Sequence, residues 1–185
     1  MNQRLIYVMG PSGAGKDSVL GWLRERLPPG LPVHWAKRTI TRPVAVIGEE
    51  HEEIDTANFV SLQAQGQFAL SWQANGLHYG VRHTELSALQ LGHWVLVNGS
   101  REYLYNAQKC YPGLQVVHIT VDPATLIQRL TARQRETAEQ IQRRVERASA
   151  FNVPQEAIEI FNNGTLDQAG KALLQELAGL EAWPS

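Results

Sequence analysis

A stretch near the start of the chain, GPSGAGKDSVL at residues 10–20, has the residue types and spacing that bind phosphate groups. It fits the pattern G-x-x-x-x-G-K-[ST] at Gly10, Gly15 and Lys16. Glycines let successive backbone N–H groups turn toward phosphate oxygens, and the lysine reaches the β- and γ-phosphates. The stretch therefore predicts a nucleotide site made of Gly10, Ser12, Gly13, Ala14, Gly15, Lys16, Asp17 and Ser18.

Asp17 stands where this pattern calls for serine or threonine. A hydroxyl there is a neutral Mg²⁺ ligand, whereas a carboxylate is a charged oxygen donor that could bind Mg²⁺ directly or through water. Ser18, one position on, could supply a hydroxyl instead. The alternative is that Asp17 only stabilises the positive end of the following helix. We expect Asp17 and Ser18 to bind Mg²⁺.

The loop lies between a strand and a helix that the sequence predicts. Residues 5–9, LIYVM, form a continuous apolar run that is typical of a strand buried on both faces of a parallel sheet. Leu20, Leu23 and Leu27 recur at helical spacing, and Pro28-Pro29-Gly30 ends that helix. A strand before the loop and a helix after it are the context that a phosphate-binding loop requires.

The later chain alternates predicted strands and helices. Strands are expected at residues 94–97, 116–121 and 157–161, and helices after Asp122-Pro123, from the capping pattern Thr137–Gln140, and over 166–180. This alternation predicts one α/β domain over residues 1–185, a parallel sheet flanked by helices. Residues 37–83 are polar and lack the alternation, so we expect an insertion there that binds a second substrate.

Composition narrows the classes of partner. The chain has 185 residues and a formal net charge of −1, so bulk charge favours neither nucleic acid nor an anionic membrane. No apolar run approaches the ~20 residues that span a bilayer. The single cysteine, Cys110, excludes an internal disulfide and fits the reducing cytosol. The oligomeric state, including a homodimer, stays open.

Further motifs follow the loop in a fixed order: Thr39-Ile40-Thr41-Arg42-Pro43, Gly48-Glu49, Phe68, Trp72, Tyr79-Gly80 and an arginine-rich stretch. Together with GPSGAGK they make the chain resemble the guanylate kinase family over nearly its full length. The resemblance implies a P-loop NTPase fold with an acceptor-binding insertion and a mobile lid, here residues 131–147. It also implies transfer of the γ-phosphoryl group of ATP to a phosphate.

The resemblance implies roles for individual residues. Arg42 would grip the acceptor phosphate, and Tyr79 would hydrogen-bond it. Lys16, with Arg133 and Arg144 of the lid, would stabilise the transferring group. Glu49 matches an acceptor-side carboxylate, and Asn163 lies in the segment that resembles the adenine-side loop.

Three further residues are acceptor candidates on chemical grounds. Resemblance to one subgroup of this family implies an acceptor with two phosphates, which calls for more than one arginine. Arg38 lies close to Arg42 in sequence, although it could equally be a solvated surface residue. Asn98 and Arg101 follow a predicted strand, at the end where α/β sheets bind ligands.

Other charged residues favour plainer interpretations. Arg135, Arg143 and Arg147 are expected in surface ion pairs of the Glu139–Arg143 type. The acidic run at residues 49–55 is typical of a solvated loop. His51 and His78 are more often surface or core histidines than functional ones. Asp122, followed by proline, is expected to cap a helix rather than bind a metal.

The chain departs from the family at the residues that recognise the base of a nucleotide acceptor. Ser71 stands before Trp72 where a guanine-reading glutamate is expected, residues 43–47 lack a second arginine, and Val97-Asn98-Gly99-Ser100-Arg101 replaces an acidic strand end. A site without those acceptors loses its specific hydrogen bonds to guanine. GPSGAGKDS, ITRP, GEEH, HYG and VNGSR make the chain resemble one subgroup of the family, and this resemblance implies a sugar phosphate acceptor. The missing base readers fit it, because such an acceptor has no base. The alternatives are a nucleoside monophosphate kinase and a non-catalytic interaction module, against which the retained lysine and lid arginines argue.

Overall fold

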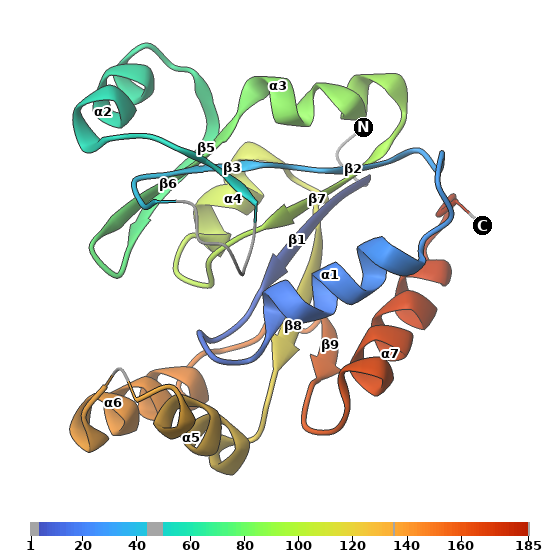
Figure 1. Cartoon of the computed structure of the whole chain (residues 1–185). Helices are drawn as coiled ribbons and strands as arrows, with labels where there is room; N and C mark the ends of the chain where they lie inside the picture. The colour runs from blue at the N-terminus through green and yellow to red at the C-terminus, as the bar shows by residue number, and fades with distance from the viewer. Residues whose placement is uncertain (1–3, 44–49, 135, 185) are drawn as a thin grey trace. The chain divides into compact units, whose positions relative to one another are not determined.

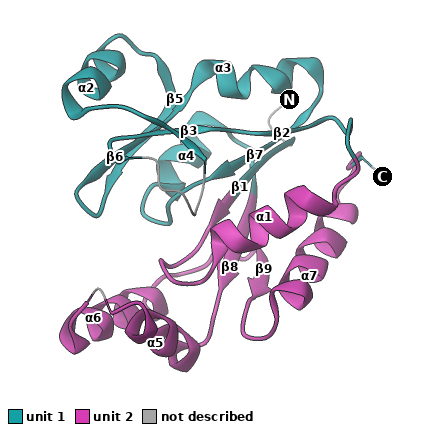
Figure 2. Ribbon diagram, viewed as in Figure 1, with its two compact units in different colours: residues 1–7, 29–115, 184 teal, residues 8–28, 116–183, 185 magenta. Residues whose placement is uncertain are grey.

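Figure 1 shows the computed structural model, which describes residues 4–43, 50–134 and 136–184. The chain divides into two compact units, coloured separately in Figure 2. Unit 1 comprises residues 1–7, 29–115 and 184, and unit 2 comprises residues 8–28, 116–183 and 185. The expected insertion at residues 37–83 falls within unit 1, and the expected lid at residues 131–147 falls within unit 2.

Unit 2 is built on parallel strands with helices beside them. Its elements are the last two residues of β1 (Leu5–Met9), α1 (Lys16–Arg26), β8 (Gln115–Thr120) without its first residue, α5 (Pro123–Ala132), α6 (Ala138–Ser149), β9 (Ile158–Phe161) and α7 (Leu166–Ala178). The strand order is β1-β8-β9, and β8 pairs parallel with β9. Helices α5 and α6 pack on each other, as do α1 and α7 (Figure 1). This is the α/β arrangement that the sequence predicts.

Unit 1 contains strands of two sheets. In the first, β2 (Val33–Trp35), β7 (Trp94–Asn98) and the start of β1 are neighbours in that order, and β2 pairs parallel with β7. The second sheet has the order β4-β3-β6-β5, from β3 (Arg38–Ile40), β4 (His51–Glu53), β5 (Phe68–Ala74) and β6 (Leu77–Arg82). The helices are α2 (Thr56–Ala64), α3 (His83–Leu86), the 3₁₀ helix η2 (Ser87–Leu91) and α4 (Leu104–Cys110).

The buried residues follow the apolar pattern of the sequence. All five residues of β1 are fully buried, and all five of β7 are buried. Strands covered on both faces read as unbroken apolar runs, because no side chain of theirs faces water. Among the described residues, no helix combines the length and the apolar character needed to cross a membrane.

The structure confirms several elements predicted from the sequence and contradicts part of the loop predicted over the acidic run. Thr137 and Gln140 form the expected capping box at the start of α6. The acidic run is not a loop throughout, because β4 pairs with β3, and Asp55 caps α2 by accepting from the amide of Asn58 at 2.8 Å. The described part of the insertion includes the helix α2, and its strands form a sheet of their own.

Helices α1 and α7 approach each other at a glycine. A Cβ atom on Gly170 of α7 would lie 2.2 Å from ring atoms of Trp22, which is buried on α1. The guanidinium of Arg26 lies 4.2 Å from the Trp22 ring centroid. The indole is therefore confined, and the helices meet closely because residue 170 has no side chain.

We expect Gly170→Ala to destabilise the protein by about 1–3 kcal/mol, because the added methyl group forces the packed indole to move. Gly21→Ala is the matched control, since a Cβ at this α1 position meets nothing within 4 Å. That exchange is expected to stabilise the fold by about 0.4–1 kcal/mol through lower backbone entropy of the unfolded chain. Urea unfolding measures both changes, and equal effects of the two exchanges would contradict the packing described.

Candidate active site

The phosphate-binding loop connects β1 to α1 within unit 2. Gly15 has φ 84°, a left-handed conformation that glycine adopts without strain, and it is the N-cap residue of α1. Lys16 begins the helix, and its Nζ donates to the carbonyl of Gly10 at 3.0 Å. Asp17 and Ser18 are exposed in the first turn of α1. The lysine and both oxygen donors thus lie together at the start of one helix.

The loop is held by two side chains from later in the chain. The carbonyl of Ala14 accepts hydrogen bonds from Asn162 Nδ2 at 2.8 Å and from an Arg129 Nη at 3.3 Å. Arg129 also donates to the carbonyl of Asn162 at 2.7 Å. A Cβ on Gly15 would lie 2.6 Å from Asn162 Nδ2, so only glycine fits there. No local sequence pattern indicates this role of Asn162, which is 5% exposed.

Of the two expected lid arginines, Arg144 contacts the loop. One of its Nη atoms donates to Ser12 Oγ at 3.3 Å, and the other pairs with Glu136 at 2.5 Å. The side chain of Glu136 is 14% exposed and that of Arg144 is 26% exposed, so the pair is largely shielded from water. Arg133 is exposed at the C-cap of α5.

The surface ion pair expected of the neighbouring arginines is confirmed for Arg143. Arg143 pairs with Glu139 at 2.6 Å, four residues apart, as expected. Arg147 instead donates to the carbonyl of Arg143 at 3.4 Å. Arg135 lies outside the described residues.

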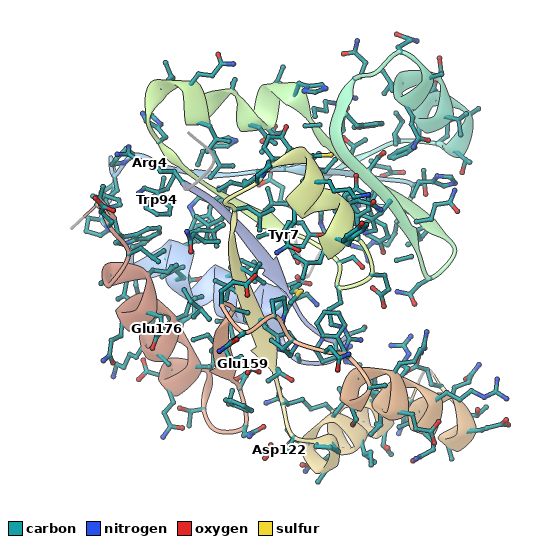
Figure 3. All side chains as sticks on the ribbon, turned by 180° about the vertical axis from the view of Figure 1, so that it is seen from behind. Arg4, Tyr7, Trp94, Asp122, Glu159 and Glu176 are labelled. Carbon is teal, nitrogen blue, oxygen red and sulfur yellow. The ribbon has the colours of Figure 1, made fainter. Side chains whose placement is uncertain are left out.

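Asn163 and Asp122 are joined by two hydrogen bonds within unit 2. Asn163 Oδ1 accepts from the backbone amide of Asp122, and Asn163 Nδ2 donates to the Asp122 carboxylate, both at 2.8 Å. Asp122, labelled in Figure 3, is the N-cap residue of α5, as expected, but its side chain makes no capping hydrogen bond. The Asn163 amide therefore joins the segment after β9 to the start of α5.

The acceptor candidates lie in unit 1. Arg38 is 9% exposed, and its guanidinium lies 5.2 Å from the ring centroid of Tyr79, which is itself 8% exposed. This burial excludes the solvated surface position that was the alternative for Arg38. Arg42 is exposed just after β3, and its carbonyl accepts from Nε2 of His51 at 2.9 Å. His51 is 3% exposed, so it fixes the backbone that carries Arg42.

Asn98 is buried at the end of β7, and Arg101 follows it by three residues with partial exposure. Both therefore lie at the carboxyl end of a parallel strand, as the sequence predicts. Glu49 lies outside the described residues.

The position expected to read a base is occupied by a short side chain. Ser71 Oγ accepts from Gln63 Nε2 at 3.1 Å, and the Ser71 amide donates to the hydroxyl of Tyr103 at 3.4 Å. The next residue, Trp72, stacks on Tyr103 and on Tyr79, with ring centroids 5.5 Å apart in both pairs. The side chain of Ser71 is thus hydrogen-bonded to an amide group and its backbone amide to a phenol hydroxyl.

Glu52 crosslinks the second sheet of unit 1. Its carboxylate accepts from Nε and an Nη of Arg82 at 2.8 and 2.7 Å, and from Thr39 Oγ1 at 2.7 Å. The hydrogen bonds from Arg82, and then that from Thr39, hold the pKa of Glu52 below its usual value, although burial acts in the opposite direction. Glu52 thus has a structural role, as Asp55 does at the start of α2.

We expect Asn162→Ala to raise the KM for ATP about 3- to 10-fold, because Ala14 loses the shorter of its two hydrogen bonds and the loop becomes less ordered. Initial rates at varied ATP measure this. Asn152→Ala, at an exposed position of the same unit, is the control and leaves the KM unchanged. A fall in thermal stability with no change in KM would contradict the loop-holding role.

The lowered pKa of Glu52 makes its stabilising effect depend on pH. A carboxyl whose pKa is lowered on folding contributes stability above its unfolded pKa of about 4.3, and the contribution is lost as the pH falls through the folded value. We expect Glu52→Gln to be less stable than the wild type at neutral pH, and the difference to shrink below about pH 4. Urea unfolding at several pH values measures it; a difference independent of pH would contradict the assignment.

Comparison with known proteins gives relatives over nearly the whole chain. The ribose 1,5-bisphosphate phosphokinase PhnN of Thiobacillus denitrificans is 44% identical over 180 residues, which cover 97% of this chain and 95% of that protein. The protein of the same name from Pseudomonas paraeruginosa is 43% identical over 182 residues, 97% of each chain. The one from Laribacter hongkongensis is 46% identical over 175 residues, but the chain spans only 42% of its length.

A crystal structure of guanylate kinase from Anaplasma phagocytophilum shares the fold. The TM-score is 0.69 at 16% identity, with 94% of this chain and 84% of that chain covered. At that identity the likeness concerns the fold alone, and it identifies an α/β P-loop NTPase fold of the guanylate kinase type. No family model matches the sequence. Because its relatives at 43% and 44% identity match it nearly end to end, the chain belongs to the ribose 1,5-bisphosphate phosphokinase PhnN family and is a kinase.

Proposed function

We propose that the chain transfers the γ-phosphoryl group of ATP to the 1-phosphate of ribose 1,5-bisphosphate. An oxygen of the 1-phosphate forms the new bond to the γ-phosphorus, and the bond between that phosphorus and the β,γ-bridging oxygen breaks. The products are ADP and 5-phosphoribosyl 1-diphosphate. The relatives' name, ribose 1,5-bisphosphate phosphokinase, supports this acceptor.

The observation that carries the choice of acceptor is the surroundings of Ser71. A guanine-reading site needs buried hydrogen-bond acceptors that match the base, and a mismatch there lowers affinity strongly. Here a serine hydroxyl is hydrogen-bonded to Gln63, and the backbone amide is hydrogen-bonded to Tyr103. A base-free acceptor requires no such reader, so this site fits a sugar phosphate better than a nucleotide.

The donor side of the reaction is assigned to unit 2. Lys16 would hold the β- and γ-phosphates as a point charge, and the loop amides would bind their oxygens. Arg144, already at Ser12, would stabilise the charge on the equatorial oxygens of the transferring group, and Arg133 would join it. No general base is required, because the attacking phosphate oxygen is already an anion.

Asp17 and Ser18 fit a Mg²⁺ ion, because both offer exposed oxygen donors in the first turn of the helix that follows the loop. Mg²⁺ usually keeps several waters and takes one or two protein ligands beside substrate phosphates, so this small donor set is sufficient. When bound, the ion supplies positive charge that neutralises the β- and γ-phosphates. The carboxylate of Asp17 would then no longer repel the triphosphate.

The acceptor side is assigned to unit 1. The cations that would bind the two phosphates are Arg38, Arg42 and Arg101, since one guanidinium group can donate to two phosphate oxygens at once. Tyr79 would donate to the same phosphates, and Asn98 would bind the sugar. Glu49 remains predicted to bind the hydroxyl groups of the sugar.

The test is release of ADP from ATP and Mg²⁺, with ribose 1,5-bisphosphate and GMP assayed side by side. Turnover with the sugar bisphosphate and a new diphosphate signal in phosphorus NMR are expected, with none from GMP. Lys16→Met is expected to lower kcat about 100- to 1000-fold, because the substitution removes the positive charge that stabilises the transferring phosphoryl group. Gly21→Ala, away from the loop, is the folded control with wild-type turnover.

Turnover with GMP and none with the sugar bisphosphate would overturn the proposed acceptor and favour the nucleoside monophosphate kinase. If neither acceptor gives ADP, the proposed reaction is wrong, and binding without catalysis becomes the better account.

A further inference from the structure

A tyrosine lies at the centre of the most buried strand of the chain. Tyr7, labelled in Figure 3, is the only residue of β1 with a polar side-chain group, and it is 0% exposed. Burial raises the pKa of its hydroxyl, so the group stays protonated and can donate. A buried hydroxyl without partners is unfavourable, so its hydrogen bonds show what it contributes to the fold.

Both hydrogen bonds of Tyr7 go to the backbone of one residue. The hydroxyl donates to the carbonyl of Ser100 at 2.9 Å and accepts from the amide of Ser100 at 2.8 Å. These two residues are 93 positions apart in sequence. The Tyr7 hydroxyl thus pairs with both the backbone amide and the backbone carbonyl of Ser100, in the segment after β7.

The ring of Tyr7 fixes the residue before Ser100 as well. A Cβ on Gly99 would lie 2.1 Å from Cζ of Tyr7, so the backbone passes directly against the ring. The Ser100 carbonyl also accepts from the amide of Tyr103 at 3.3 Å, and the Arg101 carbonyl accepts from the amide of Leu104 at 3.2 Å. The segment from Gly99 to Arg101 is therefore a defined turn that leads into α4, with Tyr7 beneath it.

This turn carries two of the acceptor residues assigned above. Asn98 precedes Gly99, and Arg101 follows Ser100. A long arginine side chain binds a phosphate well only if its backbone is already positioned, because ordering it on binding costs affinity.

We propose that Tyr7 is a positioning residue for the acceptor: through Gly99 and Ser100 it holds the turn that presents Asn98 and Arg101 to the sugar bisphosphate. This inference rests on the proposed function for the identity of the acceptor. Phenylalanine would fill the same volume, so packing alone does not require the hydroxyl, whereas positioning of Ser100 does.

The first test is Tyr7→Phe, which keeps the ring and removes both hydrogen bonds. The KM for ribose 1,5-bisphosphate rises about 5- to 10-fold, as expected for losing hydrogen bonds that order the site, while the KM for ATP changes less than about twofold. Ile6→Val, the adjacent fully buried position, is the matched control: it lowers stability without changing the ratio of the two KM values. Equal changes of both KM values in Tyr7→Phe would overturn the proposal.

A double variant tests whether Tyr7 acts through Arg101. If it does, adding Tyr7→Phe to Arg101→Ala changes the KM for the sugar bisphosphate little beyond Arg101→Ala alone, because the positioned side chain is already gone. Fully multiplicative effects would show that Tyr7 does not act through this arginine.

Hydrogen exchange separates this proposal from the identity of the acceptor. In Tyr7→Phe the amides of residues 99–103 exchange about tenfold faster than in the wild type, as expected for a lost hydrogen bond, while residues 10–15 are unchanged. If the wild type gives no turnover with ribose 1,5-bisphosphate, the proposed function fails, but this exchange measurement still decides the role of Tyr7. Unchanged exchange at residues 99–103 would overturn it.

Discussion

A loop that binds phosphate through backbone amides must turn its carbonyl oxygens elsewhere, and in unit 2 this constraint is met by two distant side chains. Asn162 and Arg129 both bind the carbonyl of Ala14, and Arg129 also binds the carbonyl of Asn162. Unpaired carbonyls near a phosphate would repel it, so holding this one away favours the anion. The left-handed Gly15 then leads into α1, whose positive end faces the same loop.

The residues of unit 1 that we propose to bind the acceptor depend on the same kind of support. Arg42 lies on backbone held by the buried His51, and the turn with Arg101 is held by the buried Tyr7. In both places a polar side chain that is almost fully buried bonds to main-chain atoms beside an arginine. Arginine side chains are flexible, so a fixed backbone lowers the entropy lost when they bind a phosphate.

The sequence was sufficient for the elements whose signals are local. The apolar run of β1, the glycine pattern of the loop and the Thr137–Gln140 capping box each occupy a few consecutive residues, and each prediction is confirmed. The acidic residues at positions 51–55 wrongly indicate a solvated loop. The pairing of β4 with β3 and the Arg82 partner of Glu52 are not visible in a local pattern.

The supports of the site could not be predicted, because their partners are far apart in the chain. Asn162 is 148 positions from Ala14, and Tyr7 is 93 positions from Ser100. Such contacts depend on which strands become neighbours, and sequence spacing carries no trace of that. For His51 the sequence predicts only a surface or core position, and the structure adds that its ring is hydrogen-bonded to the Arg42 carbonyl.

The central claim is that the acceptor is bound by its phosphates and sugar, without a base. Calorimetric titration of ribose 1,5-bisphosphate and of GMP into the protein saturated with a non-hydrolysable ATP analogue and Mg²⁺ tests this most directly. The account predicts saturable binding of the sugar bisphosphate at least about 100-fold tighter than that of GMP, since a mismatched base leaves buried polar groups unpaired. Binding of GMP as tight as that of the sugar bisphosphate, or tighter, would contradict it.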